Sequence, residues 1–171
     1  MTAGLLLAIC ISLAARLDTG YPPGIEPQPF APLLGLPAPG FEITGLDGGS
    51  ISLHTLTTAA KNEAGVLFFT NSACPACDAT YPALKRAAAQ LPVLVIGVGV
   101  EEDLRTKLAQ HGLEVSAGYD SQFEVGNRYG VQVHPSTLLI DGDGVVLTAA
   151  IGERSVDRIL QEWQDRRGER R

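Results

Sequence analysis

The stretch TNSACPACDATYPALKRAAAQ, residues 70–90, decides the fold. It places Cys74 and Cys77 directly after the apolar run GVLFFT, residues 65–70. That run is short enough for a buried strand. The following residues, 75–91, have helical periodicity, with an apolar stripe formed by Leu84, Ala87, Ala88 and Leu91. The sequence therefore predicts a pair of cysteines at a strand-to-helix junction.

The predicted position of Cys74 at a helix N-terminus favours a reactive thiolate. The unpaired N–H groups and the dipole of the first turn favour negative charge, and the thiolate is the nucleophilic form of cysteine. Pro75 suits the first helical position, because a backbone N–H at that position would have no hydrogen-bond partner within the helix. Cys77 lies one turn further on the same side, where it can resolve a mixed disulfide formed by Cys74.

Two structural alternatives fit this spacing less well. A disulfide between these cysteines would close a loop of a few residues and constrain the unfolded chain little. Structural zinc needs three or four ligands, but there is no second C-x-x-C, and His54, His111 and His134 are scattered. A C-x-x-C beside alternating strands and helices indicates a thioredoxin-like redox motif.

The rest of the chain predicts an α/β fold with a mixed central sheet and helices on both faces. Strands separated by helices imply a parallel central pair with right-handed crossovers. The predicted order is hairpin, helix, strand, helix, strand, helix, hairpin, helix, with the extra hairpin at the N-terminus of the domain and the second one near its end. The predicted ranges are hairpins at 41–53 and 136–152, a strand at 92–100, and helices at 101–112, 121–130 and 153–167.

The predicted domain organisation has four parts. Residues 1–17 are expected to be a signal peptide or membrane anchor, 18–39 a Pro-rich extended linker, 40–167 the thioredoxin-like domain and 168–171 a charged tail. The apolar run at residues 3–15 would rise about 20 Å as a helix, short of the ~30 Å hydrocarbon core, and it has no basic residue before it. A buried core helix is the alternative for this run.

Composition limits the function classes. The chain has 171 residues, 45% of them hydrophobic, and a formal net charge of −6, which argues against a nucleic-acid partner. The terminal arginines are interspersed with acids, as in a solvated helix end. Cys10 lies in the apolar N-terminal run after Ile9, which is not the small residue that a lipoprotein acceptor requires, so we expect it to be inert.

Three segments carry a resemblance to a known family: LPAPGFEITGLDGGSISL at 36–53, VLFFTNSACPACDATYP at 66–82 and YGVQVHPSTLLIDGDGVV at 129–146. Over residues 36–165 the chain resembles the exported thioredoxin-fold thiol–disulfide oxidoreductases of the TlpA/ResA type. It is also similar to the MauD type of methylamine utilisation clusters. Pro82 falls where the helix proline of this fold lies.

The resemblance implies a site around the cysteine pair. Pro135 would be a cis-proline beside the dithiol, and His134 and Pro135 would contact an extended client segment as an added strand does. An ordinary trans proline before a strand is the alternative. The redox-active disulfide would need no other cofactor. Partners would be cysteine-containing client proteins and a membrane or periplasmic redox protein, with the domain periplasmic or extracytoplasmic and residues 3–15 as a candidate inner-membrane anchor.

This chain departs from its relatives at positions near the cysteines. Ala73 replaces a common Trp, Phe68 stands where thioredoxins carry a buried acid, and Thr80 stands where ResA-like enzymes have Glu. A buried carboxylate can take the proton of the resolving thiol. Asp78 could serve if it turned inward, although a solvated position on the helix is the simpler expectation.

His134 and the residues between the cysteines are candidates for redox tuning. Protonated, His134 would favour the thiolate and make the pair more oxidising. It could also be a passive polar residue, or complete a copper site with the two cysteines. Pro75 and Ala76 add no cation, which favours a reductant.

The predicted function is an extracytoplasmic thiol–disulfide oxidoreductase that acts on protein cysteines and leans towards reduction. A copper chaperone that uses Cys74, Cys77 and His134 is the binding-module alternative. A peroxiredoxin-like peroxidase fits less well, because its motif has Thr three residues before the reactive cysteine. That position is Asn71 here, with Thr70 one residue away.

Overall fold

The structure is a computed structural model that describes residues 30–61 and 63–169. The predicted signal peptide or anchor and the first part of the linker lie outside the described residues. The elements in chain order are η1 Ala31–Leu33, β1 Glu42–Thr44, β2 Ser50–Ser52, α2 Leu53–Ala60, β3 Ala64–Asn71, α3 Pro75–Ala88, β4 Val93–Val98, α4 Glu101–Gln110, β5 Ser116–Tyr119, α5 Glu124–Arg128, β6 Ser136–Asp141, β7 Val146–Ile151 and α6 Ser155–Glu169.

The five-stranded sheet has the order β5-β4-β3-β6-β7, which confirms the predicted mixed sheet. β3 pairs in parallel with β4, and β4 with β5, whereas β6 runs antiparallel to both β3 and β7. The predicted N-terminal hairpin forms a separate two-stranded sheet of β1 and β2. β3, which leads into the cysteine pair, is thus the central strand.

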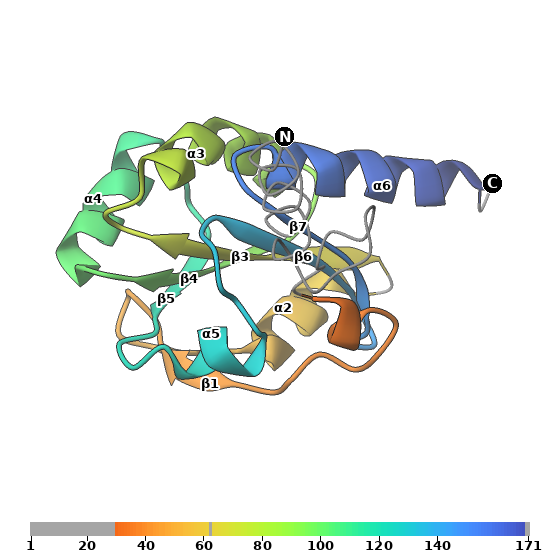
Figure 1. Ribbon diagram of the computed structural model, residues 1–171, viewed down its shortest axis with the longest axis horizontal. Coiled ribbons are helices and arrows are strands. Elements are labelled where there is room, and N and C mark those ends of the chain that lie inside the picture. The colour runs from red at the N-terminus through yellow and green to blue at the C-terminus, as the bar shows by residue number, and fades with distance from the viewer. Residues whose placement is uncertain (1–29, 62, 170–171) are drawn as a thin grey trace, which may run out of the picture.

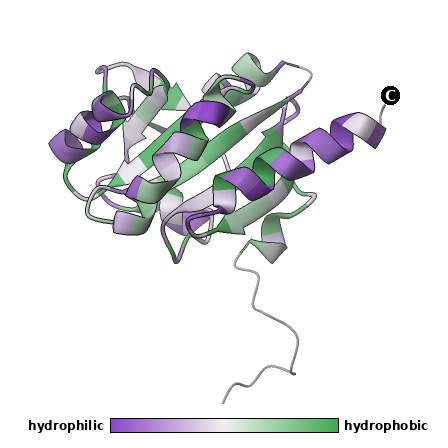
Figure 2. Ribbon diagram, turned by 90° about the horizontal axis from the view of Figure 1, so that it is seen from above, coloured by the Kyte–Doolittle hydropathy of each residue, from purple (hydrophilic) through white to green (hydrophobic). Residues whose placement is uncertain are grey.

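Helices cover both faces of this sheet, with α3, α4 and α6 on one side and α2, α5 and the β1–β2 hairpin on the other (Figure 1). Successive β3 side chains point to opposite faces. Val66 and Phe68 therefore pack under α3, and Leu67 and Phe69 pack under the other layer. The apolar strands lie beneath helices whose outer surfaces are hydrophilic (Figure 2).

Residues 30–39 do not extend away from the domain as the linker prediction expects. Phe30 is buried, and the segment runs beside β7, where Gly35 N–H donates to Val146 O at 2.8 Å and Ala38 N–H donates to Gly144 O at 2.7 Å. Phe30 and Ala38 are buried, whereas Leu34 and Leu36 remain exposed, so burial at a few positions and these hydrogen bonds hold the segment.

Other boundaries differ from the sequence-based ranges. The helix expected between the first hairpin and the first buried strand is α2, for which no bounds were predicted. β5 was not predicted, and α3 ends at Ala88 because Ala89 is its C-cap. α6 continues to Glu169, so it includes the start of the predicted charged tail. Within the described residues, no helix has both the length and the apolar character to cross a membrane.

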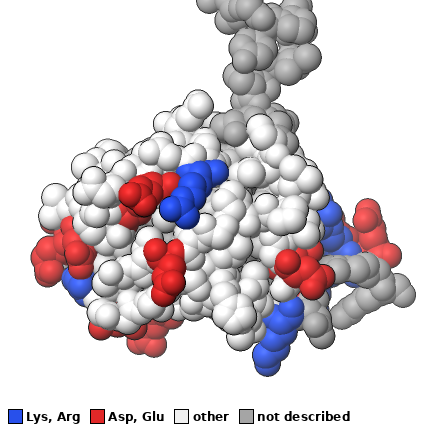
Figure 3. All heavy atoms as spheres, turned by 90° about the horizontal axis from the view of Figure 1, so that it is seen from below, with Lys and Arg blue, Asp and Glu red and all other residues white. Residues whose placement is uncertain are grey.

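Charged side chains are scattered over the face that Figure 3 shows, with acidic and basic groups side by side and wide uncharged areas between them. This is the side of the molecule opposite to α3 and α6.

Candidate active site

Cys74 is the N-cap residue of α3 and is half-buried. The backbone N–H of Cys77 donates to Cys74 Sγ at 3.3 Å, and the N–H groups of Cys77 and Asp78 also lie 3.1 and 3.3 Å from Cys74 O. The first turn of the helix thus presents the backbone N–H of Cys77 to the sulfur, as the predicted position of Cys74 at a helix N-terminus requires.

The loop before Cys74 is held by its own side chains. Asn71 Oδ1 accepts from Ala73 N–H at 2.9 Å, and Ser72 Oγ accepts from Val100 N–H at 2.7 Å. Gly99 has φ +98°, and a Cβ there would lie 2.4 Å from Ser72 Oγ. The side chain of Asn71, at the position that a peroxidase motif gives to Thr, therefore closes this turn.

Cys77 is completely buried behind Cys74. The pKa of the Cys77 thiol is raised to about 12, first by burial and second by its hydrogen bond with Cys74, whereas hydrogen bonds from the Asn71 backbone and the Thr70 side chain oppose the shift. Both cysteines are in the free thiol form. Cys77 is therefore protonated near neutral pH and must lose a proton before it can attack.

The positions at which relatives carry an acid hold none here. The Phe68 ring packs edge-on against Tyr81, with the centroids 6.3 Å apart. Thr80 Oγ1 donates to Ala76 O at 2.9 Å and to Glu153 O at 3.3 Å, which ties α3 to the start of α6. Asp78 does not turn inward, since both of its carboxylate oxygens accept from Lys107 Nζ, at 2.6 and 2.9 Å.

The loop before β6 brings His134 and Pro135 to the cysteine pair. The peptide bond between them is cis, and the Cys74 thiol donates to His134 O at 3.6 Å. Pro135 O accepts from Gly152 N–H at 2.8 Å, and Ser136 Oγ donates to Val133 O at 2.6 Å. These bonds fix the loop backbone beside Cys74. Of the other predicted site residues, Pro75 begins α3 and is exposed, and Ala76 follows it, half-buried.

The His134 ring turns towards Phe123, with 5.8 Å between centroids. Burial lowers the pKa of His134, and its Nε2 is buried without a hydrogen-bond partner among the described residues. These surroundings favour the neutral imidazole rather than the protonated one on which the tuning hypothesis depends. Phe123 could not be recognised from the sequence as a neighbour of His134, because only the fold brings it to this loop.

The described residues also include no group of three or more His, Cys, Asp and Glu side chains that could hold a metal ion. The copper alternative therefore gains no support from Cys74, Cys77 and His134. His54 lies on α2 beside Thr58, and His111 lies 5.0 Å from the Tyr81 ring, between centroids.

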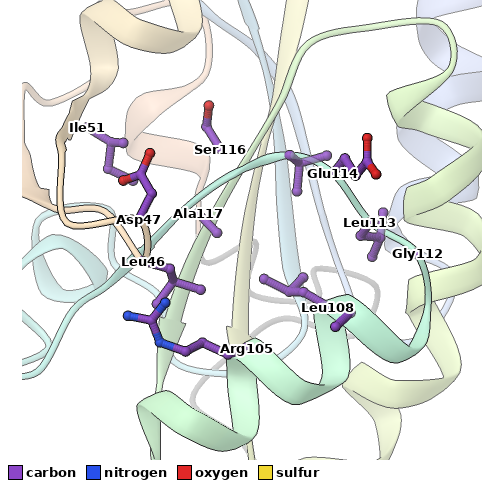
Figure 4. Close-up of a pocket in the computed structure, with 12 residues that line it drawn as sticks. Leu46, Asp47, Ile51, Arg105, Leu108, Gly112, Leu113, Glu114, Ser116 and Ala117 are labelled. Carbon is purple, nitrogen blue, oxygen red and sulfur yellow. The ribbon is translucent and has the colours of Figure 1, made fainter.

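A groove of about 570 Å³ lies away from the cysteines, between β5, the end of α4 and the turn of the β1–β2 hairpin. Leu46 and Asp47 of the turn line one side, and Arg105 and Leu108 of α4 line the other (Figure 4). None of its lining residues belongs to the loops around Cys74 and Pro135.

Two residues next to Cys77 were missed from the sequence. Thr70, the penultimate residue of β3, and Tyr81, on α3, are both fully buried, and their hydroxyl oxygens lie 3.3 Å apart. The alternation of β3 and the four-residue spacing of Cys77 and Tyr81 could have indicated the pair.

Comparison with known proteins places this geometry in a family. Residues 34–149 match the AhpC/TSA family. The chain is 27% identical over 146 residues to the methylamine utilization protein MauD of Methylobacillus flagellatus, covering 84% of this chain and 70% of the relative. It is 29% identical over 132 residues to the thiol-disulfide oxidoreductase ResA of Bacillus thuringiensis, covering 74% of each.

Solved structures agree with these matches. A protein from Chlorobium tepidum assigned as the thiol:disulfide interchange protein DsbE superposes with a TM-score of 0.65 and 26% identity, covering 76% of this chain and 94% of that one. A secreted disulfide oxidoreductase of Mycobacterium tuberculosis has a TM-score of 0.62 over 73% of this chain and 95% of its own, and at 21% identity it shows the shared fold.

Proposed function

The chain belongs to the AhpC/TSA family and is a thioredoxin-fold thiol–disulfide oxidoreductase, and on this premise we propose that it reduces disulfides of client proteins outside the cytoplasm. The observation that carries the proposal is the position of Cys74 Sγ, at the N-terminus of α3 and 3.6 Å from His134 O. A client disulfide that reaches this sulfur also meets the backbone of the Pro135 loop.

The reaction needs the two cysteines and no further cofactor. The Cys74 thiolate attacks one client sulfur, the client disulfide breaks and one client thiolate leaves. Cys77 then attacks Cys74 Sγ, the mixed disulfide breaks and the second client thiolate leaves. Two electrons pass from the dithiol to the client, and the proton of Cys77 ends on a client sulfur. A membrane or periplasmic redox partner would reduce the Cys74–Cys77 disulfide again.

Client binding would use the exposed backbone and the apolar rim around Cys74. Val133 and Val100 are 47% and 56% exposed, one beside His134 and the other bonded to Ser72. An extended segment that flanks the client cysteine could pair with this loop in the manner of an added strand. The apolar run at residues 3–15 supports the extracytoplasmic location.

The test is the reduction potential of the Cys74–Cys77 couple, measured together with reduction of insulin disulfides. We expect a reducing potential and activity that falls to background in Cys74→Ser, whereas Cys10→Ser retains it. Cys77→Ser should accumulate mixed disulfides that identify clients. Full activity of Cys74→Ser would exclude this cysteine as the nucleophile. Consumption of hydrogen peroxide faster than reduction of insulin would favour a peroxidase.

A further inference from the structure

We propose that the Thr70 hydroxyl, oriented by the hydroxyl of Tyr81, stabilises the Cys77 thiolate during the resolving step. This inference rests on the proposed function and assigns two further residues to it. Thr70 would act directly on the reacting sulfur, and Tyr81 would be a positioning residue that acts through Thr70.

The backbone brings three polar groups into one dry space. Thr70 alternates along β3 with Val66 and Phe68, so its side chain points to the α3 face. Cys77 and Tyr81 are four residues apart on α3 and share one side of the helix. The exposed fraction of Thr70, Cys77 and Tyr81 is 0%. Polar groups buried in this way need hydrogen-bond partners.

The donors and acceptors of the Thr70 and Tyr81 hydroxyls allow Thr70 to donate a hydrogen bond to the Cys77 thiolate. Thr70 Oγ1 and Tyr81 OH lie 3.3 Å apart, and either oxygen can donate. A threonine hydroxyl has one hydrogen and two lone pairs. When Tyr81 donates to Thr70, the hydrogen of Thr70 is free for the sulfur of Cys77. The Thr70 hydrogen bond lowers the pKa of Cys77 against the larger effect of burial, in accordance with a donor to the thiolate.

The aromatic rings around Tyr81 hold its hydroxyl in place. Phe68 packs edge-on against the Tyr81 ring, and the centroid of the His111 ring lies 5.0 Å from that of Tyr81. The side chains of Cys74 and Thr70 both affect the pKa of Cys77 through hydrogen bonds, and the nearby acid, Asp78, is paired with Lys107. A neutral hydroxyl pair therefore occupies the interior where relatives use a carboxylate.

The proposed step balances without an added reactant. Cys77 loses its proton, its sulfur bonds to Cys74 Sγ, and the bond between Cys74 and the client sulfur breaks. The client thiolate leaves with the electron pair of that bond and takes up the proton. Thr70 and Tyr81 stay neutral throughout, since they donate hydrogen bonds and accept no proton.

The resolving step can be measured separately with dithiobis(nitrobenzoate) on the reduced full-length chain carrying Cys10→Ser. Cys74 releases the first nitrothiobenzoate in a bimolecular phase, and Cys77 releases the second in a unimolecular phase. We expect Thr70→Val to slow the second phase about tenfold, as for the loss of one hydrogen bond to a charged group. The first phase should stay within about twofold of the reference chain, since Thr70 does not act on Cys74 in this proposal.

Two further variants separate hydrogen bonding from packing. Thr70→Ser keeps the hydroxyl and should retain the second phase, whereas Tyr81→Phe should slow it several-fold. Between about pH 6 and pH 9 the rate of the second phase should rise with pH in every variant, since the thiolate is the nucleophile, and Thr70→Val should follow a parallel, lower line.

The proposal is overturned if Thr70→Val resolves as fast as the reference chain, or if Thr70→Ser is slowed as much as Thr70→Val. Should Thr70→Val fail to fold, Tyr81→Phe decides, and an unchanged second phase refutes the assignment. Absence of a first phase in the reference chain would instead refute the proposed function, so the two failures are distinguishable.

Discussion

Cys74, on the outer side of the α3 N-terminus, and Cys77, on its inner side, have different contacts, although both belong to the same helical turn. On the outer side, backbone N–H groups and the His134 carbonyl surround the half-buried Cys74. On the inner side, the Thr70 and Tyr81 side chains lie behind the fully buried Cys77. The backbone of the fold supplies the contacts of Cys74, whereas the surroundings of Cys77 depend on the identity of individual side chains.

The largest expected change in stability comes from removing a buried side chain on the inner side, near Cys77. Phe68→Ala should lower the free energy of unfolding by about 3–5 kcal/mol, because it removes a fully buried ring beside Tyr81 and leaves a cavity. Urea unfolding followed by Trp163 fluorescence measures this. The matched control on the outer side is Val133→Ala, which should change stability by no more than about 0.5 kcal/mol. Equal losses of stability in Phe68→Ala and Val133→Ala would contradict the distinction between a packed inner side and an exposed outer side.

Gly99→Ala tests the backbone of the outer side. Its φ of +98° is unfavourable for alanine, and the new Cβ would meet Ser72 Oγ. We expect a loss of about 1–3 kcal/mol in the free energy of unfolding. Gly40→Ala is the control, since a Cβ there meets nothing within 4 Å and φ is ordinary. A Gly99→Ala protein as stable as this control would show that the loop is not held as described.

The pH dependence of stability should report the inner thiol. Burial raises the pKa of Cys77 from its ordinary 9.0 to about 12. Below pH 9 the thiol is protonated in both states and its contribution is complete. Between pH 9 and pH 12 only the unfolded chain ionises, so the folded state loses about 1.4 kcal/mol per pH unit.

Comparison of the reduced protein with Cys77→Ala isolates this contribution. Burial also raises the pKa values of Tyr81 and Tyr129, and this effect of burial is present in both proteins and cancels. The stability difference between the two proteins in urea should change by about 1 kcal/mol from pH 9 to pH 10, because the unfolded thiol is already half ionised at pH 9. A constant difference over this interval would mean that Cys77 titrates as in the unfolded chain.

The smallest expected effect is that of the His134 side chain on the reduction potential. Burial lowers the pKa of His134 below 6.5, so at pH 7 the ring carries no charge that could favour the Cys74 thiolate. His134→Gln should leave the potential within about 10 mV, measured by equilibration with glutathione. A fall of about 30 mV, equivalent to ~1.4 kcal/mol, would restore the tuning hypothesis.

The sequence reveals the parts of this molecule that depend on local order along the chain. The GVLFFT run followed by Cys74 and Pro75 was enough to predict the strand, the helix start and the position of the dithiol. The bounds of α2 were not predicted because its sequence, LHTLTTAA, is rich in threonine, a weak helix former, and depends on the capping box between Ser52 and Thr55. β5 was missed because its small residues owe their place to Ile43 and Ile51, which pack against Gly118.

The inner side of the site depends on pairs that are distant in sequence. Thr70 and Tyr81 are eleven residues apart, so their contact follows only once the face of β3 and the start of α3 are both known. The charge state of His134 likewise depends on Phe123 and on burial, which no local pattern encodes. Sequence reasoning located the cysteines but not the surroundings of Cys77.

The docking of residues 30–39 beside Val146 determines how the domain carries mechanical load. Val146 pairs with Ile140, which pairs with Gly65 near the start of β3, whereas Cys74 follows the opposite end of that strand. A pull on the chain at Phe30 is therefore borne by hydrogen bonds at the end of the sheet far from the dithiol. If the domain were held at this point, the reactive sulfur of Cys74 would lie at the opposite end of the sheet from the attachment.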